Sequence, residues 1–256
     1  MFRPVEQINI VRFNSDASCK FVDEYEAFWD KTIQEANTRQ PSQTFAPSSI
    51  RCPRISWFRL RGVKPESSDN ADRVLDFSAK IGTGCHATIQ ANLEQMLGEN
   101  WIDVETYMKS KQFKYEYTCE KVDHETRIEI SSPPIKFAPD GIIFYKGEYR
   151  LLEIKTSEYS SFDRLVDPKP QHMDQVKCYC TLLDLDSALV LYQDRQYGSL
   201  KCYEVKVSQP DKDKIWNMFE DVMLKVKQNI APPRLPIGDG WCNPSHCRYY
   251  NKCKEW

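Results

Sequence analysis

The spacing of apolar residues changes along this chain, and the change limits the folds that the chain can adopt. Some segments repeat apolar residues at the helical period of about 3.6 residues, and the predicted helices are 16–40, 48–62, 71–97, 171–185 and 211–226. Other segments alternate apolar and polar residues, and the predicted strands are 113–119, 127–130, 141–145, 149–156, 188–192 and 200–207. This order of elements predicts an α/β fold with a mixed central sheet flanked by helices.

The length and composition predict one sizeable domain with an appendage. The chain has 256 residues, of which 41% are hydrophobic, so it can bury a large core. We expect an N-terminal helical extension at residues 1–47 and a main domain at residues 48–256. No apolar run reaches the roughly 18 residues of a membrane span, and residues 1–13 lack the pattern of a signal peptide. The expectation is therefore a soluble, cytoplasmic protein with no membrane partner.

Two acidic residues and a lysine form the most informative local pattern. Asp140 precedes one predicted strand, and Glu153 and Lys155 are two positions apart on the next, so their side chains point to one face while Ile154 points into the core. A hairpin between these strands would bring Asp140 alongside. Carboxylates of this kind suit Mg²⁺ or Mn²⁺, and a nearby lysine suits the orientation or deprotonation of water.

Further candidates lie on the flanking predicted helices. His86 follows Gly82 by one helical turn, and Gly82 is expected to let that helix approach the sheet. Gln175 and Tyr179 share one face of the next helix. Taken singly, His86 also fits a satisfied core histidine, and the Gln175 and Tyr179 pair also fits an ordinary helix surface. Three strand glutamates are open both as ligands for a second metal and as solvated residues: Glu116, Glu120 and Glu129.

The motifs Gly82-x-x-x-His86, Asp140, Glu153-x-Lys155 and Gln175-x-x-x-Tyr179, in this order, resemble those of the RecB-like nucleases in the PD-(D/E)XK superfamily. The resemblance covers residues 48–256 and implies a restriction-endonuclease-like core. It implies that metal is bound by His86, Asp140, Glu153 and the Ile154 backbone carbonyl. It also implies that Lys155 acts on the attacking water or on the charged transition state, with Gln175 and Tyr179 supporting the lysine and the DNA backbone.

The cysteines point to a second site. The chain has ten, and three of them, Cys242, Cys247 and Cys253, close a tail rich in Pro and Gly. Three thiolates leave a tetrahedral or cubane site one ligand short, and Cys52 is the candidate for the fourth. The arrangement resembles the iron-sulfur subgroup of RecB-like nucleases, which includes AddB-type subunits and the CRISPR-adaptation nuclease. This resemblance implies a [4Fe-4S] cluster joining the two ends of the domain into a cap. A Zn²⁺ site and unliganded buried thiols are the alternatives.

The charge balance bears on nucleic-acid binding. The formal net charge of −2 argues against a protein that coats nucleic acid through many Lys and Arg, so any basic surface is expected to be local. If the cysteines join their two segments, basic and aromatic residues form one patch suited to phosphate contact and base stacking. Its members are Arg51, Arg54, Arg59, Arg61, Arg248, Tyr249, Tyr250 and Lys252. The same residues also fit solvated arginines and tyrosines packed on the cluster.

These features predict a metal-dependent deoxyribonuclease, an exonuclease acting on single-stranded DNA or on DNA with a free end. Its expected setting is recombination, repair, phage DNA processing or CRISPR-like adaptation. Two other functions remain open at this stage: a DNA-binding or scaffold protein without catalysis that keeps the fold and cluster, and a site-specific endonuclease.

Overall fold

The computed structural model describes residues 16–37, 42–66, 73–122, 125–236, 239–244 and 247–256. The chain divides into two compact units, one formed by residues 1–39 and 68–77 and the other by residues 40–67 and 78–256. The larger unit begins before the boundary at residue 47 that the sequence suggested. The reason is Phe45, which is fully buried in the main core and whose backbone N–H donates to the carbonyl of Pro134.

The smaller unit contains helix α1 (Asp16–Asn37) and the first turn of helix α3 (Arg73–Leu97). The Trp29 indole N–H donates to Asp76 at 2.6 Å, and Arg73 forms an ion pair with Asp30 at 2.6 Å. Several large apolar side chains of this unit remain exposed, namely Phe21, Val22, Tyr25, Phe28, Val74, Leu75 and Phe77. Polar contacts therefore contribute much of the association within this unit.

The larger unit is built on a mixed five-stranded sheet with the order β1-β5-β6-β7-β8. Its strands are β1 (Trp101–Ile102), β5 (Gly141–Tyr145), β6 (Glu148–Ser157), β7 (Ser187–Asp194) and β8 (Leu200–Lys206). Strands β6 and β7 are parallel, and the other neighbours are antiparallel. The turn between β5 and β6 contains Lys146 and Gly147, both with positive φ, as in the tight hairpin turn that the sequence predicted.

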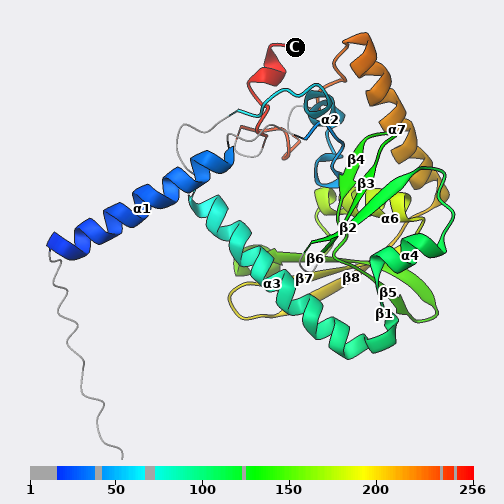
Figure 1. The fold of residues 1–256 in the computed structure, drawn as a ribbon, viewed down its shortest axis with the longest axis horizontal. Helices are drawn as coiled ribbons and strands as arrows, with labels where there is room; N and C mark the ends of the chain where they lie inside the picture. The colour runs from blue at the N-terminus through cyan, green and yellow to red at the C-terminus, as the bar shows by residue number, and fades with distance from the viewer. Residues whose placement is uncertain (1–15, 38–41, 67–72, 123–124, 237–238, 245–246) are drawn as a thin grey trace, which may run out of the picture. The chain divides into compact units, whose positions relative to one another are not determined.

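Helices cover both faces of this sheet (Figure 1). On one face, Ile89 of α3 packs with Ile143, Leu152 and Ile154. On the other face lies the main core, which contains Leu151 of β6 and Val176 of α6 (Pro170–Leu183). Helix α7 (Gln209–Gln228) packs against α6 in turn. Because side chains alternate along a strand, β6 directs Leu152 and Ile154 to the α3 face and the residues between and beyond them to the α6 face.

A separate antiparallel sheet consists of β2 (Tyr117–Val122), β3 (Glu125–Ile130) and β4 (Ile135–Phe137). The expected strand 113–119 is wrong at its start, because β2 begins only at Tyr117. Phe113 and Tyr115 precede the strand and are partly buried against the main core, where Tyr115 lies 5.9 Å from the Trp216 ring. Their alternation therefore reflects the packing of an irregular segment. The sequence pattern did not predict two short helices, α4 (Val104–Ser110) and α5 (Tyr159–Asp163).

The helix expected at 48–62 is in fact two pieces, a 3₁₀ turn (Pro47–Ser49) and α2 (Pro53–Leu60), with Cys52 as the extended N-cap residue between them. The break follows from Pro53, because the residue before a proline disfavours helical backbone. Two further 3₁₀ turns are η2 (Gly98–Asn100) and η3 (Lys252–Lys254). Within the described ranges, no helix combines the length and the hydropathy that crossing a membrane requires.

Candidate active site and cysteine cavity

A cleft with a volume of about 570 Å³ lies where α3, the central sheet, α6 and the β2–β3 hairpin meet. It is lined by the six side chains that the sequence proposed for catalysis or metal binding, His86, Asp140, Glu153, Lys155, Gln175 and Tyr179. The structure thus gathers residues from α3, α6, β6 and the position just before β5, up to 93 positions apart, from residue 86 to residue 179.

Asp140 stands immediately before β5 and is held at several atoms. Its Oδ2 accepts a hydrogen bond from the Ile154 N–H at 2.6 Å, and its Oδ1 lies 3.3 Å from His86 Nδ1. Gln90, one turn beyond His86 on α3, donates to the Asp140 backbone carbonyl at 2.7 Å. Because a strand residue presents its N–H and C=O to the same neighbour, the Ile154 carbonyl also faces the side on which Asp140 lies.

Residue 141, which follows Asp140, has to be a glycine because the Trp101 ring of β1 packs directly on its backbone. A Cβ added at Gly141 would lie 2.7 Å from the Trp101 ring, which is closer than atoms normally approach. Gly82 behaves differently from the expectation that it lets α3 approach the sheet. A Cβ there would meet Thr156 Oγ1 at 3.5 Å, an ordinary van der Waals contact, so the position of His86 does not depend on a missing side chain at residue 82.

The second half of the site is a chain of hydrogen bonds from β6 to α6. Lys155 Nζ donates to Glu153 Oε1 at 2.6 Å and to Gln175 Oε1 at 3.1 Å. The Gln175 amide N–H donates to the Tyr179 hydroxyl at 3.3 Å, and that hydroxyl donates to the Ala138 carbonyl at 3.1 Å. The segment carrying Asp140 is therefore held from α6 through Ala138 and from α3 through Gln90.

The electrostatics of the cleft follow from its burial. Loss of hydration raises the pKa of the Glu153 carboxyl, the negative charge of Asp140 adds to this, and the Lys155 ammonium opposes it. For His86, desolvation lowers the pKa, but the hydrogen bond to Asp140 and the charge of that carboxylate outweigh it, so the pKa is raised. Burial and the neighbouring Asp140 carboxylate thus disfavour the charged form of Glu153, while Asp140 favours the protonated form of His86.

One structural observation supports the binding of a divalent cation by the carboxylates of this cleft. Glu153 is only 2% exposed, and its Oε2 has no hydrogen-bond partner among the described residues. A buried carboxylate oxygen of this kind costs free energy unless a cation or donor meets it. Among the residues that the structure describes, no three His, Cys, Asp or Glu side chains already converge on one point as metal ligands. His86 and Asp140 instead contact each other, and Glu153 contacts Lys155, so metal binding would require these side chains to rotate.

Several lining residues were not anticipated from the sequence, and three of them, Gln90, Glu125 and Arg127, have long polar or charged side chains. Gln90 was overlooked although it follows His86 by one helical turn, a spacing that places both on one face. Glu125 and Arg127 also line the cleft, from the exposed face of β3. The glutamates considered for a second metal do not: Glu116, Glu120 and Glu129 are absent from the cleft lining that the structure describes, and Glu129 pairs with Lys136 at 2.5 Å.

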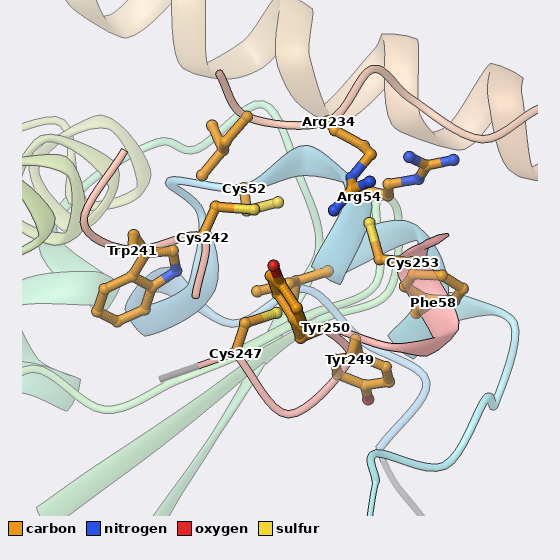
Figure 2. Close-up of a pocket in the computed structure, with 12 residues that line it drawn as sticks. Cys52, Arg54, Phe58, Arg234, Trp241, Cys242, Cys247, Tyr249, Tyr250 and Cys253 are labelled. Carbon is orange, nitrogen blue, oxygen red and sulfur yellow. The ribbon is translucent and has the colours of Figure 1, made fainter. Parts of the chain in front are cut away.

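The four proposed cluster cysteines surround a second, smaller cavity (Figure 2). Cys52 lies at the start of α2, and Cys242, Cys247 and Cys253 come from the tail, with their sulfur atoms turned toward the same enclosed space. The remaining lining is largely apolar and aromatic. All ten cysteines are free thiols. The Cys52 thiol is buried, which raises its pKa to about 11, although the backbone amides of Ile55 and Arg54 act in the opposite direction.

The four cysteines supply the ligand type and number of a group bound by thiolates. The cavity has a volume of only about 10 Å³, and among the described residues no three of these side chains already converge as metal ligands, so binding a metal or cluster would require them to shift. Four sulfurs line this space, which is the number of ligands in a tetrahedral zinc site or a cubane iron-sulfur site. Apolar side chains around them would shield such a site from water. Burial raises the pKa of the Cys52 and Cys247 thiols, and a bound cation would displace their protons. The donor set does not by itself choose between iron-sulfur and zinc.

The residues suggested for DNA contact beside this cavity are mostly engaged within the protein. Arg51 bridges Asp174 and Asp239, at 2.8 and 2.9 Å, and Arg54 is buried with its guanidinium donating to the Trp256 carbonyl. Arg59 donates to the Thr44 carbonyl at 3.2 Å.

The tyrosines of the same group also pack. Tyr249 is buried, stacks on Phe58 at 5.2 Å and donates to the Val63 carbonyl. Tyr250 is half-buried and lines the cysteine cavity, with the Lys254 ammonium over its ring. The structure thus favours the alternative in which these side chains pack around the cavity.

Comparisons with known proteins bear on the fold. No family model matches the chain, and no curated protein matches it either. The crystal structure of SSO0001 aligns with a TM-score of 0.51 and 17% identity, covering 91% of this chain and 96% of that one. The chain shares its fold with SSO0001.

Structural neighbours also include an alkaline exonuclease, LHK-Exo from Laribacter hongkongensis. It aligns with a TM-score of 0.47 and 11% identity over 74% of this chain and 90% of that one. Its complex with dAMP aligns with a TM-score of 0.45 and 14% identity, over 73% and 89%. The case for function therefore depends on the cleft itself.

Proposed function

We propose that this protein is a divalent-metal-dependent deoxyribonuclease that hydrolyses phosphodiester bonds in the cleft where α3, the central sheet, α6 and the β2–β3 hairpin meet. The observation that carries the proposal is the unpartnered, buried Glu153 Oε2 in a cleft that also presents Asp140, His86 and Lys155. The order of these residues along the chain, which resembles that of RecB-like nucleases, supports the same reaction.

We assign each side chain of the cleft a role according to its position. Asp140, Glu153, His86 and the Ile154 carbonyl would hold Mg²⁺ or Mn²⁺, which when bound supplies charge neutralisation at the phosphate and a more acidic water. Lys155, held by Glu153 and Gln175, presents an ammonium group at the cleft surface where charge develops on the phosphate. Gln175 orients the lysine, and Tyr179 and Gln90 hold the backbone that carries Asp140.

The size of the cleft supports a single strand as substrate. A volume of about 570 Å³ lies within the range of pockets for drug-sized ligands, about 300–1,000 Å³. Such a space suits a short stretch of one strand and is too small to enclose a double helix. Together with the resemblance to RecB-like nucleases, this supports exonucleolytic cleavage of single-stranded DNA or of a free DNA end as the proposed reaction.

For the second site we propose a [4Fe-4S] cluster bound by Cys52, Cys242, Cys247 and Cys253, with Zn²⁺ as the alternative. Support comes from four free sulfurs around one apolar cavity. The group would fasten the start of α2 to the C-terminal tail, and its role is structural.

The direct test uses the purified full chain with Mg²⁺ or Mn²⁺ and DNA labelled separately at each end, single-stranded and double-stranded. We expect stepwise loss of nucleotides from single strands or free ends, and no cleavage once EDTA removes the metal. Binding of DNA without cleavage under every metal condition would contradict the proposal and favour a scaffold function. Cutting of circular DNA at fixed sites would instead indicate a site-specific endonuclease.

A further inference from the structure

Arg127 is placed in the cleft by the regular alternation of β3. Thr126, Ile128 and Ile130 point into the protein, while Arg127 points outward and lines the same cleft as Asp140 and Lys155. Strand β3 is paired along its whole length with β2, so the orientation of Arg127 is fixed by the sheet. Its sheet is distinct from the one that carries Asp140 and Lys155.

Within the described ranges of the chain, the guanidinium of Arg127 has no hydrogen-bond or ion-pair partner, unlike the other cations of the site. Lys155 is engaged by Glu153 and Gln175, and His86 lies against Asp140. Across β2 and β3, Glu120 is in register with Arg127, yet no ion pair joins them. Among the residues that the structure describes, the Arg127 side chain makes neither an ion pair nor a hydrogen bond.

An exposed, unpaired guanidinium that faces a cleft for a polyanion is suited to phosphate. Its planar group presents parallel N–H donors that match two phosphate oxygens. Most other arginines of the larger unit are used internally, as Arg51, Arg54 and Arg150 show. Arg127 is therefore available to substrate without breaking a contact of the folded protein.

We propose that Arg127 forms a phosphate subsite on the wall opposite α3, and that it binds a backbone phosphate of single-stranded DNA next to the bond that is cut. This rests on the proposed nuclease function and deepens it. The strand passes between the β2–β3 wall and the α3 wall of the cleft. Arg127 contributes to binding rather than to bond cleavage, because the side chains assigned to metal binding and hydrolysis come from α3, the start of β5, β6 and α6, whereas Arg127 comes from β3.

The test measures binding separately from cleavage. A labelled single-stranded DNA oligonucleotide of about 16 nucleotides, the upper end of single-strand site sizes, is titrated with the full chain without added divalent cation. The salt concentration is varied from about 50 to about 200 mM. The variants are Arg127→Ala and Arg127→Lys. The matched control is Lys136→Ala, which removes one positive charge from the same small sheet at a residue outside the cleft lining.

For Arg127→Ala we expect binding about tenfold weaker, as for loss of one charged hydrogen-bonding contact. The slope of log K against log salt should fall by about 0.7, the value for one phosphate on a single strand. Arg127→Lys should recover part of the affinity, and Lys136→Ala should bind as the unaltered protein does. In cleavage assays KM should rise about tenfold for Arg127→Ala, with kcat within about twofold.

Unchanged affinity and salt slope in Arg127→Ala would overturn the proposal, as would an equal loss in Lys136→Ala. A lowered melting temperature with unchanged DNA affinity would also overturn it, since that result assigns Arg127 a structural role. Failure of the nuclease function gives a different result: the unaltered chain then binds the oligonucleotide but never cuts it, and the binding measurements still decide the role of Arg127.

Discussion

The cleft and the cysteine cavity are organised in opposite ways. In the cleft, nearly every functional side chain contacts another or a backbone group, as Lys155 does with Glu153 and Asp140 with the Ile154 N–H. In the cavity, the four sulfurs face a common space, and the contacts that hold its walls lie outside it. Examples are the Phe58–Tyr249 stack and the Glu66 carboxylate that accepts from the Lys252 N–H at 2.8 Å. The cleft is thus arranged by hydrogen bonds among its own side chains, whereas the positions of the four cysteines are set by contacts outside the cavity that they line.

This difference implies that damage to one region leaves the other intact. The two sites draw on different parts of the larger unit, since the cleft uses the central sheet with α3, α6 and β3, and the cavity uses α2 and the tail. Mutations can therefore separate the chemistry of the cleft from the architecture of the cavity.

The largest effect is expected for Lys155→Ala. Cleavage should fall about a thousandfold, because a preorganised group beside the developing charge is lost, while the cysteine cavity keeps its bound group. Single-turnover cleavage of labelled DNA, together with iron analysis, measures both. Lys136→Ala is the control and should cleave normally. A Lys155→Ala protein with full activity would refute the mechanism.

A large structural effect is expected for Cys253→Ser. The chain should lose its bound group, and the melting temperature should fall by about 5–10 °C, equivalent to about 2–3 kcal/mol at this chain length. The hydrogen bonds of the cleft should persist. Visible absorption after anaerobic purification, metal analysis and thermal unfolding measure these changes.

Cys202→Ser, at an exposed cysteine of β8, is the matched control and should retain colour and stability. A colourless protein with one zinc per chain would reject the iron-sulfur cluster and retain the metal-bound cavity. A protein with neither metal would show that the cavity holds only thiols.

The two glycines near the cleft should respond in opposite directions. Gly141→Ala forces a Cβ against Trp101 and should lower the free energy of unfolding by about 1–3 kcal/mol. Gly82→Ala has room on α3 and should raise it by about 0.5–1 kcal/mol through helix propensity. Urea unfolding of both variants measures the contrast. Equal destabilisation would mean that α3 lies closer to the sheet than the structure has it.

An effect on cleavage much smaller than that of Lys155→Ala is expected for Gln90→Ala. Loss of its hydrogen bond to the Asp140 carbonyl should cost about 0.5–1.5 kcal/mol and slow cleavage by about tenfold at most. Unfolding and single-turnover cleavage of the same preparation measure the two quantities. A loss as large as that of Lys155→Ala would mean that Gln90 contacts substrate or metal directly and does more than position Asp140.

The sequence determined the parts of the protein that depend on local periodicity. Alternation along 149–156 placed Glu153 and Lys155 on one face and Ile154 on the other, and β6 has that arrangement. Helical spacing likewise placed Gln175 and Tyr179 together, and they form a hydrogen bond. Such patterns are readable because a strand or helix fixes the direction of each side chain relative to its neighbours.

Only the tertiary structure decided which elements meet. No local pattern in 113–130 indicated that β3 would form a wall of the cleft, or that Arg127 rather than Arg51 would face it unpaired. The same holds for Gln90 with Asp140 and for Trp101 on Gly141, which are contacts between segments 40 or more residues apart. The physical reason is that period and propensity orient a side chain on its own element, whereas its partner is chosen by the packing of whole elements into one core.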